Sequence, residues 1–170
     1  MIGYENRILA AEDFNNDLKD AGELGAGHTV TALYEVIPTG VKSSFAASVD
    51  PLKYQKEEKP PINLHSKELM TIKLRYKKPD GAKSQLIEQP VVDGQLPLDK
   101  TSDNFRFSAA VGEFGLLLRD SEFKNTANYA QAIQLAKSGK GKDENGYRAE
   151  LIRLIEMMEL MSSGVVVEKE

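Results

Sequence analysis

The sequence predicts an α+β fold, in which an antiparallel β-sheet in the N-terminal half precedes three packed helices. Residues 68–77 alternate apolar and polar side chains, which is the period of a strand. Residues 103–120 repeat apolar side chains every three or four positions, which is the period of a helix. Strands thus occupy one half of the chain and helices the other, and this order argues against an alternating parallel sheet.

Length and composition narrow the class of protein. The 170 residues fit a single α+β domain, mainly β over residues 1–98 and helical over residues 99–164. A net charge of −4 argues against a nucleic-acid surface, which needs clustered lysine and arginine. No apolar run approaches the roughly 20 residues that cross a bilayer, so we expect no direct membrane insertion. The chain has no cysteine, which excludes disulfides and zinc thiolates.

Two strands are predicted in the first forty residues. Ile2–Leu9 begins without a turn or cap, so we expect it to continue an element that begins upstream and to lie at or near a sheet edge, where it can pair with another copy. His28–Ile37 alternates more regularly and ends at Pro38. Its predicted inward side chains are Val30, Ala32, Tyr34 and Val36.

A β-hairpin is predicted after a long connection. Residues 41–67 are rich in proline, serine and charge, which is typical of an exposed loop. Glu68–Lys77 then alternates as an amphipathic strand, the turn Pro79–Gly81 follows, and Ser84–Gln89 returns. Pro90 is expected to begin the crossing to the helices. The predicted inward face of the first strand consists of Met70, Ile72, Leu74 and Tyr76.

The first helix, at residues 103–120, is predicted to be central. Ser102 or Asp103 is its expected N-cap. A column of small residues, Gly112 among them, indicates that another part of the chain packs closely against it, because glycine costs a helix about 1 kcal/mol relative to alanine. The predicted core face comprises Phe107, Ala110, Val111, Phe114, Leu117 and Leu118, and the small column comprises Ser108, Gly112 and Gly115.

Two further helices are predicted at residues 128–138 and 146–162. The first is capped by Asn128 and directs Tyr129, Ala132, Ile133 and Ala136 to the core. The second carries Tyr147, Leu151, Leu154, Ile155, Met158 and Met161 on one face. Core packing is the favoured interpretation of this face. The alternative is a partner groove formed by Met157, Met158 and Met161, since methionine adapts to varied partners.

Few residues suggest chemistry. His28 has Glu23 nearby and Thr29 adjacent, so a base-assisted hydroxyl is conceivable, and His65 lies in the long loop. The motifs GxSxG, HExxH, GxxxxGK[ST] and SxxK are absent. We therefore expect no catalytic residues and no cofactor, and the binding candidates are His28, Glu23, Met158 and Met161.

Metal binding is also disfavoured. Asp13, Asn15 and Asp17 have the spacing that begins a calcium loop. Such a loop needs glycine at its sixth position and glutamate at its twelfth, where this chain has Leu18 and Leu24. A solvated turn is the favoured interpretation, with no metal.

Several stretches taken together carry a family resemblance. They are Ile2–Arg7 (IGYENR), Glu12–Asp17 (EDFNND), Asp20–Glu35 (DAGELGAGHTVTALYE), Leu74–Lys77 (LRYK), Pro79–Gly81 (PDG), Phe105–Val111 (FRFSAAV), Leu116–Ser121 (LLLRDS) and Tyr147–Leu151 (YRAEL). This combination resembles the C-terminal region of bacterial von Willebrand factor type A domain proteins of the YfbK-like group. The resemblance runs over nearly the whole chain and is weakest at residues 41–67.

The resemblance implies a domain of unknown function that follows a von Willebrand type A domain at the cell envelope, periplasmic or anchored as a lipoprotein. The upstream domain binds a divalent metal through a DxSxS motif, which this chain lacks. We therefore expect a non-catalytic accessory domain that supports protein or ligand binding, with a protein or the upstream domain as partner. The alternative is a hydrolase-like enzyme that uses His28 and Glu23.

Overall fold

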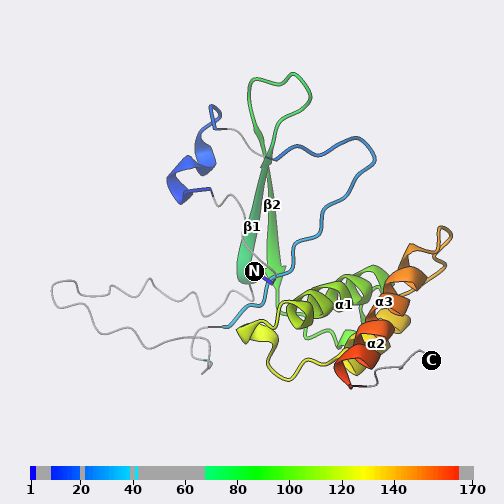
Figure 1. Ribbon diagram of the computed structural model, residues 1–170. Coiled ribbons are helices and arrows are strands. Elements are labelled where there is room, and N and C mark those ends of the chain that lie inside the picture. Colours follow the sequence, from blue (N-terminus) through cyan, green and yellow to red (C-terminus); the bar gives the residue numbers. More distant parts are fainter. Residues whose placement is uncertain (3–8, 20–21, 39–40, 42–67, 165–170) are drawn as a thin grey trace. The chain divides into compact units, whose positions relative to one another are not determined.

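The computed structural model describes residues 1–2, 9–19, 22–38, 41 and 68–164 (Figure 1). The chain forms two compact units. One contains Met1–Arg7, Leu24–Glu35 and Leu96–Glu170, and the other contains Ile8–Glu23 and Val36–Gln95. A two-stranded antiparallel sheet precedes three packed helices, so the predicted α+β class is confirmed.

The sheet is a hairpin of β1 (Glu68–Tyr76) and β2 (Gln85–Val92). At the predicted turn Gly81 donates its N–H to Lys78 O at 2.9 Å, and a Cβ on Gly81 would lie 2.9 Å from the same oxygen. Only glycine fits this approach. β2 runs beyond the predicted end and includes Pro90, because an edge strand tolerates a missing N–H.

One face of the hairpin follows the predicted alternation. Met70 pairs with Val91, and Leu74 pairs with Ile87. Ile72 and Leu74 nevertheless stay about half exposed, with relative exposures of 52% and 56%, so the predicted inward face is not a closed core within the described part of the chain.

The helices begin and end where local chemistry directs them. α1 (Asp103–Leu118) is capped by Ser102, whose hydroxyl accepts the N–H of Phe105 at 3.2 Å. It stops two residues before the predicted end, because Asp120 adopts a left-handed φ of 47°. α2 (Tyr129–Ser138) is capped by Asn128 as predicted, and α3 (Tyr147–Ser162) follows the left-handed Gly146.

The core of the helical unit lies where α2 packs against α1 and α3 (Figure 1). The Phe114 and Tyr129 rings meet edge to face, with centroids 6.3 Å apart. Three of the buried side chains are alanines, which lets the helix backbones approach closely. The buried residues are Ala110, Phe114, Ala132, Ile133, Ala136, Ile152 and Ile155.

Helix α1 buries a narrower face than predicted. Phe114 and Ala110 are buried and Phe107 packs against them, but Val111 and Leu118 are about half exposed, so their assignment to the core was wrong. These two side chains lie on the edge of the apolar stripe, which is wider than the surface α2 covers.

The column of small residues on α1 does have a close neighbour. A Cβ on Gly112 would lie 3.2 Å from Leu33 Cδ1 and 3.5 Å from Ile2 Cγ2. The backbone N–H of Ile2 also donates to Leu33 O at 2.8 Å. The expectation of close packing is therefore met at Gly112, while nothing lies within 4 Å of a Cβ on Gly115.

The prediction of a strand at residues 28–37 is wrong, because the structure assigns no strand there. The segment is free of turns and bends but belongs to no sheet. A strand requires a backbone ladder, and among the described residues the segment forms only two backbone bonds, from Ile2 N to Leu33 O and from His28 N to Gly25 O. Of the predicted strand Ile2–Leu9, residues 3–8 lie outside the described part, as does the connection 42–67.

A junction of three helix ends organises the helical unit. A Cβ on Gly139, at the end of α2, would lie 2.6 Å from Phe107 N and 2.7 Å from Asp103 O. Arg148 donates to Gly139 O at 2.7 Å, and Arg106 donates to Ser138 O at 3.0 Å. The two guanidinium groups thereby satisfy carbonyl groups at the C-terminus of α2 and complement its dipole.

Candidate functional site

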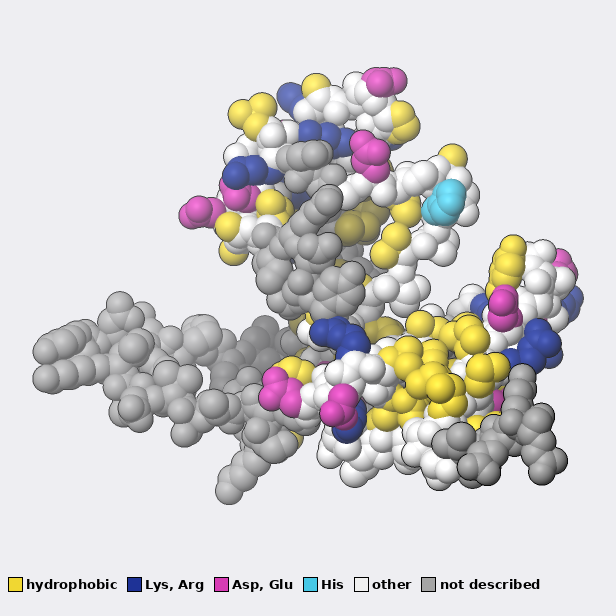
Figure 2. Space-filling model, in the orientation of Figure 1, with side chains coloured by type: hydrophobic (Ala, Val, Ile, Leu, Met, Phe, Trp, Pro, Cys, Tyr) yellow, Lys and Arg dark blue, Asp and Glu magenta, His cyan; other side chains and the backbone are white. Residues whose placement is uncertain are grey.

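Four exposed apolar side chains lie on one side of α3. Tyr147, Leu154 and Met161 recur every seven residues, and Met157 lies between the last two, so all four share one side of the helix. Their relative exposures are 72% for Tyr147, 48% for Leu154, 57% for Met157 and 66% for Met161. We call these four residues the α3 row. Figure 2 shows hydrophobic side chains gathered on the surface of the helical unit.

The core of the unit uses a different side of α3. Ile152 and Ile155 are buried, and Leu151 and Met158 pack partly against them. The predicted core positions Tyr147, Leu154 and Met161 are therefore wrong, because α3 buries the side that carries Ile152 and Ile155. Of the two methionine candidates, Met161 is exposed and Met158 is half-buried.

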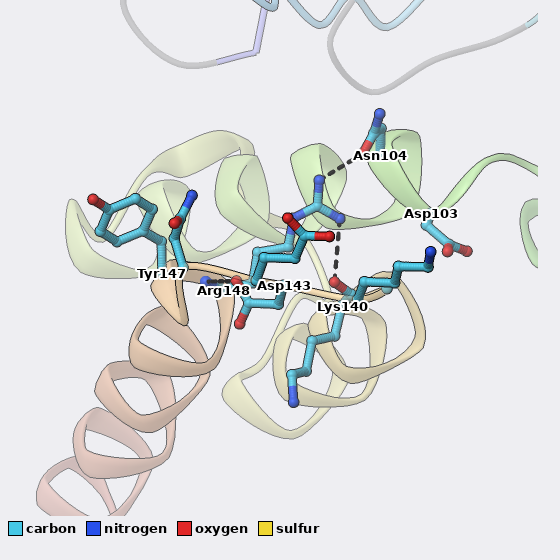
Figure 3. A pocket seen from close by; sticks show the side chains of 10 residues that line it. Asp103, Asn104, Lys140, Asp143, Tyr147 and Arg148 are labelled. Atoms are coloured by element: carbon cyan, nitrogen blue, oxygen red, sulfur yellow. Dashed lines mark hydrogen bonds between the residues drawn. The ribbon is translucent and has the colours of Figure 1, made fainter.

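A polar cavity of about 390 Å³ opens beside the loop between α2 and α3 (Figure 3). Burial alone would raise the pKa of Asp143. Its carboxylate accepts hydrogen bonds from the backbone N–H groups of Arg148 and Ala149, and these bonds lower the pKa below its ordinary value. Arg148 is engaged by Gly139 O and Asn104 Oδ1 and stacks over the Phe107 ring. The lining residues are Asp103, Asn104, Lys140, Gly141, Lys142, Asp143, Glu144, Asn145, Tyr147 and Arg148.

These contacts give the cavity a structural role. The carboxylate of Asp143 caps the start of α3, and Arg148 caps the end of α2. The ten lining residues include no serine, histidine or other residue paired as a nucleophile and base. The arrangement fixes the ends of α2 and α3.

A second depression of about 690 Å³ lies along α1 and α2. Burial raises the pKa of Glu113 above its ordinary value. A hydrogen bond from the backbone N–H of Asn128 lowers this pKa, but by less than burial raises it. The other lining groups are two amides, a guanidinium, a second carboxylate, a hydroxyl and two leucines. The residues are Leu98, Asp99, Arg106, Glu113, Gln131, Gln134, Leu135 and Ser138.

Two of the residues considered above as a calcium loop, Asn15 and Asp17, bind Arg75. Arg75 on β1 donates to Asn15 Oδ1 at 2.8 Å and to Asp17 Oδ1 at 3.0 Å. Ser84 donates to the same Asp17 oxygen, and its hydrogen bond is the main reason that the pKa of Asp17 is lowered. These contacts fasten the turn η1 (Ala11–Asn15) to the hairpin. No group of three or more metal-binding side chains occurs within the described ranges.

The two catalytic candidates are not brought together by any described contact. His28 is exposed, and its Nδ1 lies 3.2 Å from Ala26 O. Glu23 is also exposed, and neither residue lines the two cavities above. His65 lies outside the described residues.

Sequence reasoning missed the contact between η1 and the hairpin and the Arg106–Arg148 junction. Both link residues that are far apart in the chain, and Arg75 and Asp17 are separated by 58 positions. One signal was present, because Arg75 is an arginine among lysines, and arginine is the residue suited to forked contacts. No helix in the described part is long and apolar enough to cross a membrane.

Comparisons with known proteins identify the family. Residues 1–161 match the family described as "Uncharacterized protein YfbK, C-terminal". The chain is 44% identical over 156 residues to the uncharacterized protein YfbK of Escherichia coli (strain K12), covering 92% of this chain and 26% of that protein. The chain thus spans about a quarter of the length of this relative. No solved structure matches. The chain therefore belongs to the family of YfbK C-terminal domains.

Proposed function

We propose that this chain is a non-catalytic interaction domain and that the α3 row is the surface on which a protein partner docks. The single observation that carries the proposal is the exposure of the row, with Met157 at 57% and Met161 at 66%. A helix that is buried on one side and apolar on another has a second surface suited to burial. Exposed apolar side chains gathered on one side of a helix are typical of interaction sites.

The chemistry of the row fits a protein better than a small molecule. Met157 and Met161 are flexible and polarisable, and Tyr147 adds an aromatic ring with a polar end. The row is a convex helix surface, whereas small-molecule sites are concave and converge several polar groups on the ligand. An apolar helix side docks into the groove of a partner by the same pattern of spaced anchors.

The resemblance to von Willebrand type A proteins supports a location and a partner class. We propose that the domain acts at the bacterial cell envelope, next to a von Willebrand type A domain, and that it supports binding by that domain or by an envelope protein. The match to only 26% of the E. coli relative is consistent with a domain that works beside others in one polypeptide.

A hydrolase-like reaction through His28 and Glu23 is the alternative. The described contacts of these two residues give it little support. A general base needs an orienting partner within hydrogen-bond reach, and the described contact of His28 is with a backbone carbonyl two residues away. We therefore expect a hydrolase screen of the purified domain to show no turnover. Turnover that disappears in His28→Ala would overturn the non-catalytic proposal.

In-cell photocrosslinking tests the docking surface. A photoreactive benzoylphenylalanine replaces Met157 on the α3 row, and in a matched control it replaces Gln134, an exposed helical residue on α2. The proposal predicts a discrete protein crosslink from position 157 and none, or far less, from position 134. Equal crosslinking from both positions, or none from position 157, would contradict it.

A further inference from the structure

The segment His28–Ile37 has the composition of a strand but no ladder. It is rich in β-branched residues, is free of turns and bends, and pairs with no strand among the described residues. Its side chains Val30 and Tyr34 are 80% and 65% exposed. An extended segment with unpaired backbone groups can pair with another chain.

The two edges of this segment differ. In an extended chain the N–H and C=O of one residue point to the same edge, and successive residues alternate between edges. Leu33 O already accepts the N–H of Ile2, so Leu33 and its odd-numbered neighbours face Ile2. The opposite edge consists of Val30, Ala32 and Tyr34, whose backbone groups form no hydrogen bond with any part of the chain that the structure describes.

Helix α1 holds the segment in place. Gly112 lies beneath both Leu33 and Ile2, with a Cβ position 3.2 Å from Leu33 Cδ1 and 3.5 Å from Ile2 Cγ2. The helix therefore contacts both Leu33 and Ile2 through this glycine. Leu33 is held by a backbone hydrogen bond and by side-chain packing.

We propose that the edge opposite Ile2, which we call the open edge, pairs with the same edge of a second copy of this chain. The pairing is antiparallel about a two-fold axis at Leu33, so that Leu33 lies opposite itself. This surface is separate from the α3 row and does not depend on the function proposed for that row. In this register Ala32 lies opposite Tyr34 and Thr31 lies opposite Glu35, and the same register sets Val30 opposite Val36.

The sequence of the segment is complementary to itself in this register. Apolar residues oppose apolar residues, and Glu35 opposes a threonine, so no like charges meet. Another protein would have to supply a matching strand, whereas a second copy carries it already. This self-complementarity is the reason that we assign the edge to a second copy.

The helices also fit this arrangement. Neighbouring strands lie about 4.8 Å apart. Because α1 lies beneath the space between Ile2 and Leu33, the two-fold axis sets the two copies of α1 about two strand spacings apart, roughly 9–10 Å. This separation matches the 8–10 Å at which helices pack. At Gly112 the two copies of α1 would therefore lie at an ordinary packing distance.

Sedimentation equilibrium of the 170-residue chain over micromolar to millimolar concentrations tests the pairing. The mass should rise from 18.8 kDa toward twice this value. Ala32→Pro removes an N–H from the open edge and should keep the chain monomeric. Thr31→Pro removes an N–H from the Ile2 edge and should still dimerise. Far-UV circular dichroism confirms that both variants retain the helices.

A cysteine substitution gives a second readout that does not depend on proline. The chain has no native cysteine, so a single introduced thiol reports on its own contact. Opposed residues at Leu33 would have Cα atoms about 4.5 Å apart, which a disulfide can span. Leu33→Cys should oxidise readily to a covalent dimer, and Tyr34→Cys, which opposes Ala32 and not itself, should not.

Three results would overturn the proposal. These are a wild-type chain that stays monomeric throughout, a dimer that survives Ala32→Pro as well as Thr31→Pro, and equal crosslinking of the two cysteine variants. The first would leave the edge to a different protein or to no partner. The second would assign the dimer to another surface, such as the α3 row.

Discussion

Replacing Gly139 by alanine tests the close approach of α1 and α2. The new methyl carbon would lie 2.6 Å from Phe107 N and 2.7 Å from Asp103 O, both backbone atoms of α1. Backbone atoms in a helix cannot rotate away as a side chain can, so the end of α2 must move. Forcing extra volume into a packed contact costs about 1–3 kcal/mol. Gly139 has a φ of −104°, which alanine adopts without strain.

The lower entropy of the unfolded alanine chain offsets part of this cost, about 0.4–1 kcal/mol. We therefore expect Gly139→Ala to lower the free energy of unfolding by about 1–2 kcal/mol. Urea unfolding followed by far-UV circular dichroism measures this value. Gly115→Ala is the matched control, because nothing lies within 4 Å of its Cβ position. The control should raise stability by about 1 kcal/mol through helix propensity. A Gly139→Ala variant as stable as the wild type would refute the close approach.

Three further predictions concern charged groups. Ser84→Ala should raise the pKa of Asp17, measured by NMR titration, because the hydrogen bond from the serine hydroxyl is the main cause that lowers this pKa. The folded pKa of Asp17 is below its ordinary value, so the ionised carboxylate stabilises the fold above the ordinary pKa. This contribution is lost as the pH falls through the folded pKa. Glu113→Gln should stabilise the helical unit at neutral pH and lose the advantage in acid, because the raised pKa of Glu113 means that the fold favours the neutral form. Urea midpoints at both pH values decide this, and a difference independent of pH would contradict it. Asp143→Ala should lower the hydrogen-exchange protection of the first turn of α3, because two backbone N–H groups lose their acceptor.

The elements that depend on neighbouring residues were predictable. Asn128 was predicted as a helix cap, and Ser102 was one of two predicted caps together with Asp103. The side chains of Ser102 and Asn128 each accept an N–H three residues ahead. The turn at Gly81 followed from its local chemistry, because proline and glycine favour a tight turn. In each case the physical cause lies within a few residues of the element.

The elements that depend on distant residues were not predictable from one sequence. His28–Ile37 has strand periodicity, but a strand exists only when another segment supplies a ladder. The apolar stripe of α3 is wide, so its periodicity does not determine which part faces α2, and Leu154 was wrongly assigned to the core. The contact of Arg75 with Asp17 joins two parts of the chain that no local pattern connects.

Peroxide footprinting tests the central claim, that the α3 row is a docking surface, most directly. Methionine oxidation follows solvent access, so in the purified domain Met157 and Met161 should oxidise faster than the half-buried Met158, which serves as an internal reference. The measurement is then repeated on the protein in an extract of the cells that produce it. The account predicts that Met157 and Met161 become protected there relative to Met158. Unchanged relative oxidation rates would contradict it.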